Sequence, residues 1–318
     1  MSKRILFRLL GGIGLALLAA GPVSAQVITL SLADQNSPAG WGPTHALAPW
    51  VKRVEEATKG KVKIQVYPSQ TLVKGPESWN ALKSGVADMA WSFHGYWADL
   101  TPLADVITLP SLPFKTAEKG SEVLWKLYEK FPAMQREFQD VKVLMLWTSN
   151  PYFLITTKKQ VKTLEDIKGM KLRVTGGPPT EQMKALGAVP TAIPMPDNYM
   201  SMDKGVIDGM AAPWEAIHGF RLYEVAKYYT MVPLSAVYFS MSVNKQKWNS
   251  LPKDVQDAIM SVSGLEGSKF WGRNFFDTAE NGVLERVKAG NHQMTRYTLP
   301  PEEMARWQEA ESKAWGPL

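Results

Sequence analysis

The most consequential absence in this chain of 318 residues is cysteine, of which there is none. Without thiols the protein has no disulfide bonds, no thiolate ligands for zinc and no cysteine nucleophile. Its stability therefore depends on packed apolar cores, and its 45% apolar and 21% charged residues are typical of a globular protein. The length of the chain favours about two domains.

A strong excess of one charge is also missing. The chain has 36 Lys and Arg against 30 Asp and Glu, a formal net charge of +6 at pH 7. Three of the basic residues, Lys3, Arg4 and Arg8, lie in the first 25 residues, which contain no acid, so 33 against 30 leaves +3 for the remainder. This small excess, with no run of five Lys or Arg residues, argues against a nucleic-acid-binding protein.

The first 25 residues have the organisation of a cleaved secretory signal. Their basic start is followed by an apolar stretch, Leu9 to Ala20, and by the small residues Val23-Ser24-Ala25. A membrane anchor needs roughly 20 apolar residues, and this stretch is shorter and interrupted by glycines. We predict cleavage between Ala25 and Gln26 and a periplasmic location, which suits an exported chain without cysteine.

Catalytic signatures are missing as well. After the signal segment we find no nucleophile elbow, zinc-protease motif, phosphate loop or dinucleotide fingerprint. The four histidines, His45, His94, His218 and His292, are not spaced as a pair of metal ligands on a helix. We therefore expect no enzymatic activity, no cofactor and no metal site.

Strand and helix patterns alternate along the mature chain. Residues 27–32 and 61–67 alternate apolar and polar side chains, and residues 47–58 between them repeat apolar positions at helical spacing. The same alternation continues from residue 76 to residue 147 and resumes from residue 152 to residue 243. This order predicts an α/β fold with largely parallel sheets.

The series of strands and helices is interrupted at Asn150-Pro151, without a Gly/Ser linker. We therefore expect two α/β lobes between which the chain crosses more than once, with a ligand cleft between them. The predicted division assigns residues 26–150 and 235–275 to lobe I and residues 151–234 and 276–318 to lobe II. The crossings near residues 150 and 234 would form the hinge.

A helical pattern extends from Pro252 to about Ala289. At 1.5 Å per residue this helix would be roughly 50 Å long, which exceeds the width of one small lobe. It must therefore span both lobes or bend, and Gly264 and Gly267 are the expected points of bending.

One stretch, residues 163–180 (TLEDIKGMKLRVTGGPPT), places an arginine where an anion could bind. The pattern predicts a strand carrying Arg173, then the turn Gly176-Gly177 and a helix that begins with proline. A guanidinium matches a carboxylate in shape, and the free N–H groups of a helix start add donors. From the pattern alone, a solvated strand arginine is the commoner interpretation.

Five segments of the chain carry a family resemblance. In chain order they are VEEATKGKVKIQVYPSQTL, TLPSLPF, TLEDIKGMKLRV, MPDNYMSMDKGVIDGMAAP and VNKQKWNSLPKDVQDAI. Together they resemble the extracytoplasmic solute receptors of tripartite ATP-independent periplasmic (TRAP) transporters, of the dicarboxylate-receptor type. The resemblance covers essentially the whole mature chain. It implies a two-lobed binding protein, a long helix spanning both lobes, Arg173 as the carboxylate-binding residue, and membrane permease subunits as partners.

Two positions depart from what the resemblance implies for C4-dicarboxylate and sialic-acid receptors. Where many of those receptors have a second arginine, this chain has Tyr152-Phe153, and residues 210–212 are Met-Ala-Ala where they usually have Gln-Glu-Asn. Compared with those receptors, the predicted cleft of this chain therefore lacks one positive charge and several hydrogen-bonding side chains. The departures favour a small monocarboxylate, with an aromatic acid as the first expectation and an aliphatic hydroxy or oxo acid as the second.

Aromatic and histidine side chains in the loops complete the predicted ligand site. Rings stack on rings, and Tyr or His tips can hydrogen-bond a hydroxyl group of a ligand, although most tryptophans of a protein lie in its cores. From the positions that face the cleft in similar receptors, the resemblance implies that the residues contacting the ligand beside Arg173 are Tyr152, Phe153, Trp41, His94, Met195, Trp214 and Tyr238.

The leading hypothesis is therefore a periplasmic receptor that passes a small carboxylate to a membrane permease. Two other functions stay open from the sequence. One is an exported hydrolase with an unfamiliar active site, and the other is a ligand sensor that presents its closed form to a membrane signalling protein.

Overall fold

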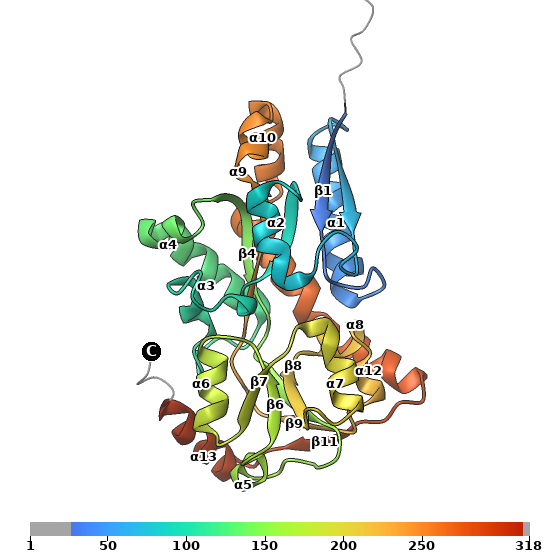
Figure 1. Cartoon of the computed structure of the whole chain (residues 1–318), viewed down its shortest axis with the longest axis vertical. Helices are drawn as coiled ribbons and strands as arrows, with labels where there is room; N and C mark the ends of the chain where they lie inside the picture. Colours follow the sequence, from blue (N-terminus) through green and yellow to red (C-terminus); the bar gives the residue numbers. More distant parts are fainter. Residues whose placement is uncertain (1–26, 314–318) are drawn as a thin grey trace, which may run out of the picture.

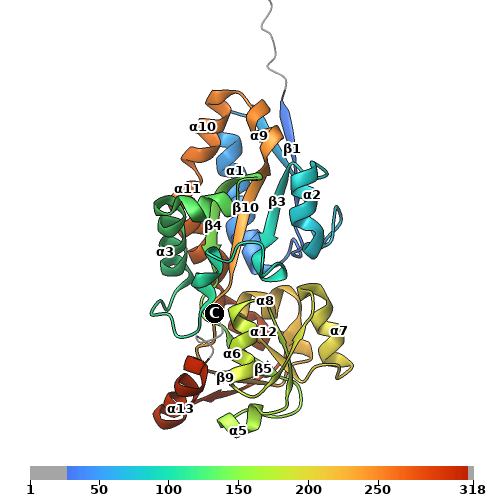
Figure 2. The same ribbon diagram turned by 60° about the vertical axis from the view of Figure 1, so that its left-hand side comes forward.

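Two α/β lobes lie one above the other along the long axis of the protein (Figures 1 and 2). The computed structural model describes residues 27–313. The predicted signal segment, residues 1–25, and its cleavage point before Gln26 lie outside the described residues. Each lobe is built around one β-sheet, which confirms the predicted two-lobed α/β class.

The first lobe has a five-stranded sheet in the order β2-β1-β3-β10-β4. Its strands are β1 (Ile28–Ala33), β2 (Val62–Tyr67), β3 (Met89–Phe93), β4 (Val141–Thr148) and β10 (Tyr238–Asn244). Its helices include α1 (Ala48–Ala57), α2 (Ser78–Ser84), α3 (Ala117–Lys130), α4 (Pro132–Glu137), α9 (Lys245–Ser250) and α10 (Lys253–Ser261).

The second lobe has a six-stranded sheet in the order β11-β9-β5-β8-β6-β7. Its strands are β5 (Phe153–Thr156), β6 (Lys171–Val174), β7 (Val189–Ala192), β8 (Gly209–Ala212), β9 (Tyr228–Met231) and β11 (Thr295–Thr298). Its helices include α5 (Leu164–Ile167), α6 (Pro178–Ala185), α7 (Asn198–Asp203), α8 (Trp214–Gly219), α12 (Ala279–Ala289) and α13 (Pro301–Ser312).

Both sheets are largely parallel, as expected, but each contains one antiparallel strand. Strand β10 is antiparallel to β3 and β4, and β5 is antiparallel to β8 and β9. The reason lies in the crossings, because β5 and β10 are the strands that receive the chain from the other lobe. They start at the boundary between the lobes, whereas the strands β1, β3, β4, β6, β8 and β9 end there.

The two crossing segments lie side by side. The backbone N–H of Ser149 donates to the oxygen of Val237 at 2.9 Å, and the Val237 N–H donates to Ser149 Oγ at 3.1 Å. One step further on, the Leu234 N–H donates to the oxygen of Tyr152 at 2.9 Å. These bonds join the segments in which the sequence predicts a hinge.

The long helical pattern is divided at Gly264. Helix α10 ends at Ser261, and Gly264 has φ +62°, a left-handed conformation that favours glycine and begins a new helix. From there α11 (Gly264–Trp271), a π-helical segment η7 (Gly272–Asp277) and α12 follow almost without interruption. Helix α11 packs on α3 and β4 of the first lobe and α12 on α8 of the second, so this run spans both lobes as expected.

The expected bend at Gly267 is absent from the described structure, because this residue lies within α11. Its N–H donates to the oxygen of Ser263 at 3.0 Å. An added Cβ would lie 3.3 Å from the sulfur of Met145, so Gly267 allows close packing of the helix on β4.

Tryptophan forms much of the first core. Trp147 and Trp271 have ring centroids 4.5 Å apart, and Trp50 meets Trp271 edge-on at 6.1 Å. All three are fully buried. In a chain without disulfide bonds, rings of this size supply a large part of the apolar area that folding removes from water.

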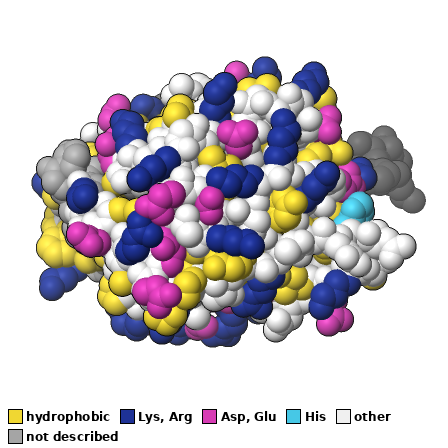
Figure 3. Space-filling model, turned by 90° about the horizontal axis from the view of Figure 1, so that it is seen from below, with side chains coloured by type: hydrophobic (Ala, Val, Ile, Leu, Met, Phe, Trp, Pro, Cys, Tyr) yellow, Lys and Arg dark blue, Asp and Glu magenta, His cyan; other side chains and the backbone are white. Residues whose placement is uncertain are grey.

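The lower face of the second lobe mixes Lys and Arg with Asp and Glu (Figure 3). Neighbouring charges on this lobe form ion pairs such as Lys184 with Glu181 at 2.7 Å. The face shown therefore has no continuous basic stripe. Between residues 27 and 313, no helix has both the length and the hydropathy needed to cross a membrane.

The contact of η7 with α3 should make Gly272 intolerant of a side chain. A Cβ at this position would lie 2.6 Å from the backbone oxygen of Ala117 and closer still to Ser121 Oγ. We expect Gly272→Ala to lower the free energy of unfolding by about 1–3 kcal/mol, measured by urea unfolding. Gly290→Ala, whose methyl would meet only the ring edge of His292, is the control, and equal stability of both variants would contradict this prediction.

Candidate functional site

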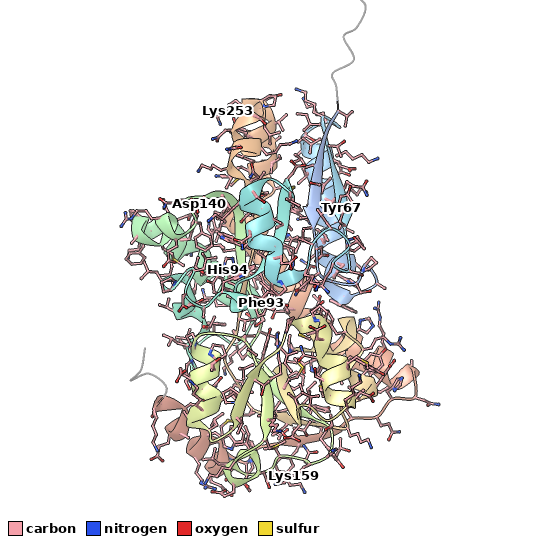
Figure 4. All side chains as sticks on the ribbon, in the orientation of Figure 1. Tyr67, Phe93, His94, Asp140, Lys159 and Lys253 are labelled. Carbon is pink, nitrogen blue, oxygen red and sulfur yellow. The ribbon has the colours of Figure 1, made fainter. Side chains whose placement is uncertain are left out.

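The ends of four strands meet at the boundary between the lobes. In the first lobe β1 leads into Asp34-Gln35-Asn36, and β3 ends at Phe93, which Figure 4 shows with His94 near this boundary. In the second lobe β6 carries Arg173 and β8 leads to Glu215. Loops at the carboxyl ends of strands are the usual position of ligands in α/β proteins.

These segments surround a small cavity of about 30 Å³. Both lobes contribute to it, and its lining combines a few polar groups with many aromatic rings. The lining residues are Gln35, Asn36, Trp91, Phe93, Tyr152, Arg173, Met195, Pro213, Glu215, Ala216, Phe220, Phe239, Phe275 and Phe276. The structure thus brings three of the predicted ligand contacts together, Arg173, Tyr152 and Met195.

Arg173 is buried, with 2% of its surface exposed, so the interpretation as a solvated strand arginine is wrong. Its Nε donates to the backbone oxygen of Ile193 at 3.0 Å, which leaves the terminal nitrogens as donors toward the cavity. Burial lowers the pKa of Arg173. Among residues 27–313 it forms no ion pair, so a bound anion would supply the missing opposite charge.

Two tyrosines accompany Arg173. Burial raises the pKa values of Tyr152 and Tyr96. The positive charge of Arg173 acts against burial and lowers both pKa values. The Tyr96 hydroxyl donates to Gln35 Oε1 at 2.8 Å and accepts from the backbone N–H of Met195 at 3.0 Å. Tyr96 and Gln35 belong to the first lobe and Met195 to the second, so this hydroxyl links the lobes beside the cavity.

A second link between the lobes is formed by backbone groups. The N–H of Gly176, in the turn after β6, donates to the oxygen of Gly95 at 2.9 Å. A Cβ on Gly176 would lie 3.0 Å from that same oxygen, so glycine permits the approach. The Gly176-Gly177 turn, predicted as part of an anion site, therefore also joins the two lobes.

Glu215 is the acidic residue of the lining, and sequence reasoning missed it. It is 4% exposed, and burial raises its pKa to about 8, with the nearby Asp34 acting in the same direction and the Gly42 amide opposing both. A signal existed, since Glu215 follows the predicted strand 206–210 closely, as Arg173 ends its own strand.

Asp34 lies behind the lining and is equally buried. Its Oδ1 accepts from the backbone N–H of Asn36 at 3.0 Å and from Asn36 Nδ2 at 2.7 Å, while Oδ2 has no partner among the described residues. Burial raises the pKa of Asp34 to about 7, against these hydrogen bonds. The cavity therefore combines one unpaired cation with two carboxyl groups that tend to be neutral.

Aromatic rings form the rest of the wall. Trp91 and Phe239 have centroids 4.8 Å apart, and Phe275 and Phe276 of the π-helical segment lie 4.9 Å apart. Phe239 and the two η7 phenylalanines were not predicted, because in the sequence they belong to a core strand and a long amphipathic helix. Only their position at the lobe boundary reveals them.

Phe153 and Trp214 lie outside this cavity lining. Their rings are 4.9 Å apart and pack with Tyr229 in the second core. They contribute instead to a separate groove at the hinge, beside Tyr152 and Trp307. Tyr152 lines both this groove and the cavity, whereas Phe153 lines only the groove.

His94, Tyr238 and Trp41 also lie elsewhere. His94 Nε2 is 2.9 Å from Ser240 Oγ, its ring stacks on Tyr238 at 4.7 Å, and burial lowers its pKa to about 3. These two rings belong to the first core. Trp41 lies across the lobe boundary, where its Nε1 donates to Thr278 Oγ1 at 2.9 Å.

The sequence model of bacterial extracellular solute-binding protein family 7 (DctP) matches residues 36–317. The chain belongs to this family. Membership confirms the predicted resemblance to TRAP solute receptors, and the function of the family is solute binding. Members are periplasmic proteins that bind small carboxylates and work with a membrane permease.

One known protein with a similar sequence and two solved structures illustrate what this chain resembles. The outer membrane transporter protein TsaT of Comamonas testosteroni is 30% identical over 280 residues, which covers 86% of this family member and 81% of that protein. A TRAP solute-binding protein from Rhodoferax ferrireducens T118 with copurified benzoate has a TM-score of 0.85 and 27% identity, covering 91% and 89% of the two chains. A marine-metagenome TRAP solute-binding protein specific for aromatic acid ligands, co-crystallised with 3-hydroxybenzoate, has a TM-score of 0.85 and 28% identity, covering 91% and 90%.

The buried carboxyl groups should make stability depend on pH. Glu215 has a pKa of about 8 when folded against an ordinary value of 4.5, so in this interval the folded state binds more protons than the unfolded state. The contribution of Glu215 to the free energy of unfolding is therefore fully present below pH 4.5 and is lost as the pH rises through 8. We expect the free energy of unfolding, measured with urea without ligand, to fall between pH 5 and pH 8.5.

The variant Glu215→Gln cannot titrate, so its stability should fall less steeply over the same range. Asp105 and Glu311, whose pKa values burial raises to about 7, act in the same direction and remain in the variant. An identical slope for the two proteins would show that Glu215 is ionised in the folded state.

Proposed function

We propose that this protein captures an aromatic monocarboxylate in the periplasm and delivers it to the membrane permease of a TRAP transporter. The observation that carries the proposal is Arg173, a buried guanidinium without an acidic partner in a cavity walled by aromatic rings. A ligand carboxylate would accept charge-assisted hydrogen bonds from its terminal nitrogens, and the ring of the acid would lie among the aromatic side chains.

The charge of the cavity supports a monoacid over a diacid. One carboxylate is balanced by Arg173, but a second would meet Glu215 and Asp34 rather than another cation. Tyr152 occupies the lining near Arg173, where a second arginine is expected in C4-dicarboxylate receptors. Benzoate and 3-hydroxybenzoate bound to the two similar structures agree with a ring-bearing monoacid.

The composition of the lining disfavours the hydrolase alternative. Among the described residues that line the cavity there is no Ser, Thr or His, so a nucleophile and its base have no place there. The sensor alternative uses the same ligand site and differs only in the membrane partner. The hydrogen bonds of Tyr96 and Gly176 hold the lobes in a closed arrangement, which is the form that a membrane partner of either kind would recognise.

Removing the guanidinium tests the proposal directly. We expect Arg173→Ala to weaken benzoate binding by roughly 30-fold or more, because a buried charge-assisted contact is worth about 2–5 kcal/mol. Arg173→Lys should also bind poorly, since an ammonium cannot reproduce the planar fork. Calorimetry measures both, with the exposed strand neighbour Lys171→Ala as the matched control, and near-wild-type affinity of both Arg173 variants would refute the assignment.

The wild-type protein should also rank three acids. We expect benzoate to bind most tightly, lactate next and succinate least, because a second buried carboxylate lacks a cation and costs several kcal/mol. Calorimetry at one pH and salt concentration gives the order. If lactate binds best, the aromatic preference fails and the monocarboxylate class stands, whereas tightest binding of succinate would overturn the class.

A further inference from the structure

Glu215 lies in the same cavity as Arg173, at the first turn of α8, with 4% of its surface exposed. Gln35, Asn36, Trp91, Tyr152 and Arg173 are the other members of the lining with hydrogen-bonding side chains. Of these, Gln35 already accepts from Tyr96 at 2.8 Å, and the Arg173 guanidinium is reserved for the carboxylate in the function proposed above. Glu215 is therefore the strongest remaining polar group toward the rest of a ligand.

The surroundings of Glu215 leave it poorly satisfied. Among residues 27–313, the Gly42 backbone amide is the one hydrogen-bonding group that lowers the pKa of Glu215, and no Lys or Arg contributes to that pKa. On the other side lie Asp34 from the first lobe and rings such as Phe220 and Phe275. A buried carboxyl group with one donor retains unused hydrogen-bonding capacity.

This capacity selects the kind of substituent that pairs with Glu215. A second carboxylate would have no cation to balance it, and a bare ring edge would cover the Glu215 oxygens without offering them a partner. A hydroxyl group both donates and accepts, so it can pair with a carboxyl group in either protonation state. Among neutral substituents, it matches Glu215.

We infer that Glu215 is a specificity residue, which hydrogen-bonds a hydroxyl group on the ring of the acid held by Arg173. The ligand class is then the hydroxylated aromatic monocarboxylates rather than unsubstituted aromatic acids. This inference rests on the proposed function and deepens it. It assigns Arg173 and Glu215, which line one cavity, to two groups of one ligand.

The test compares benzoate with the better-binding isomer of 3- and 4-hydroxybenzoate by calorimetry at pH 7. Wild-type protein should bind the hydroxylated acid about tenfold more tightly, the usual effect of one well-placed hydrogen bond. In Glu215→Leu this ratio should fall to about one, while benzoate affinity stays equal or rises because a buried polar group is gone. Glu215→Gln, which keeps hydrogen-bonding atoms, should retain part of the preference.

Glu129→Leu, the same substitution at an exposed site of α3, is the matched control and should leave the ratio unchanged. A ratio in Glu215→Leu equal to that of wild type would overturn the inference, as would tighter binding of benzoate by wild type. Failure of the proposed function looks different, because neither acid would then bind the wild-type protein.

A ligand series keeps the inference testable if Glu215→Leu does not fold. The methoxybenzoate of the same isomer lacks the hydroxyl proton and should bind wild type less tightly than the hydroxybenzoate. Equal or tighter binding of the methoxy acid would overturn the role of Glu215 as a partner of a ligand hydroxyl.

Discussion

A guanidinium buried without a carboxylate partner is the interaction on which the rest of this protein depends. Placing Arg173 at the lobe boundary costs desolvation energy, and its hydrogen bond to Ile193 offsets only part of that cost. In the function proposed above, this unmet demand for an anion is what would make the cavity a carboxylate site. The surrounding fold can be understood as the scaffold that creates this demand and keeps water and other cations away from it.

The crossing topology explains why the site lies between the lobes. Strands β6 and β8 end at the boundary from one side and β1 and β3 from the other, so their terminal residues face each other across it. The hinge segments around Ser149 and Val237 hold the lobes together through short hydrogen bonds that can persist while the lobes rotate. The helical run from Gly264 to Ala289 ties the same two lobes along another path.

Charge balance gives the cavity its selectivity. One buried cation and two carboxyl groups with raised pKa values favour a ligand that brings a single negative charge and a neutral polar group. The aromatic wall then favours a flat ligand, because rings offer large apolar area at little conformational cost. The mixture explains how a fold shared with dicarboxylate receptors can serve a different acid.

The sequence by itself determined the local elements and the family. The α/β alternation, the strand with Arg173, the Gly-Gly turn before a proline-initiated helix and the division at Gly264 all follow from the preferences of neighbouring residues, and the structure has each of them. The family resemblance also placed Tyr152 and Met195 in the predicted site, and both line the cavity with Arg173.

The tertiary structure alone decided which distant side chains share the cavity. Phe239 and Phe275 come from two elements far apart in the chain, and nothing in their own segments distinguishes them from core residues. His94 and Phe153 were predicted to contact the ligand. For the same reason, their side chains point into the cores and not into the cavity. The direction of a side chain at a strand end depends on sheet order and on antiparallel strands such as β5 and β10, which are set by long-range pairing rather than by local sequence.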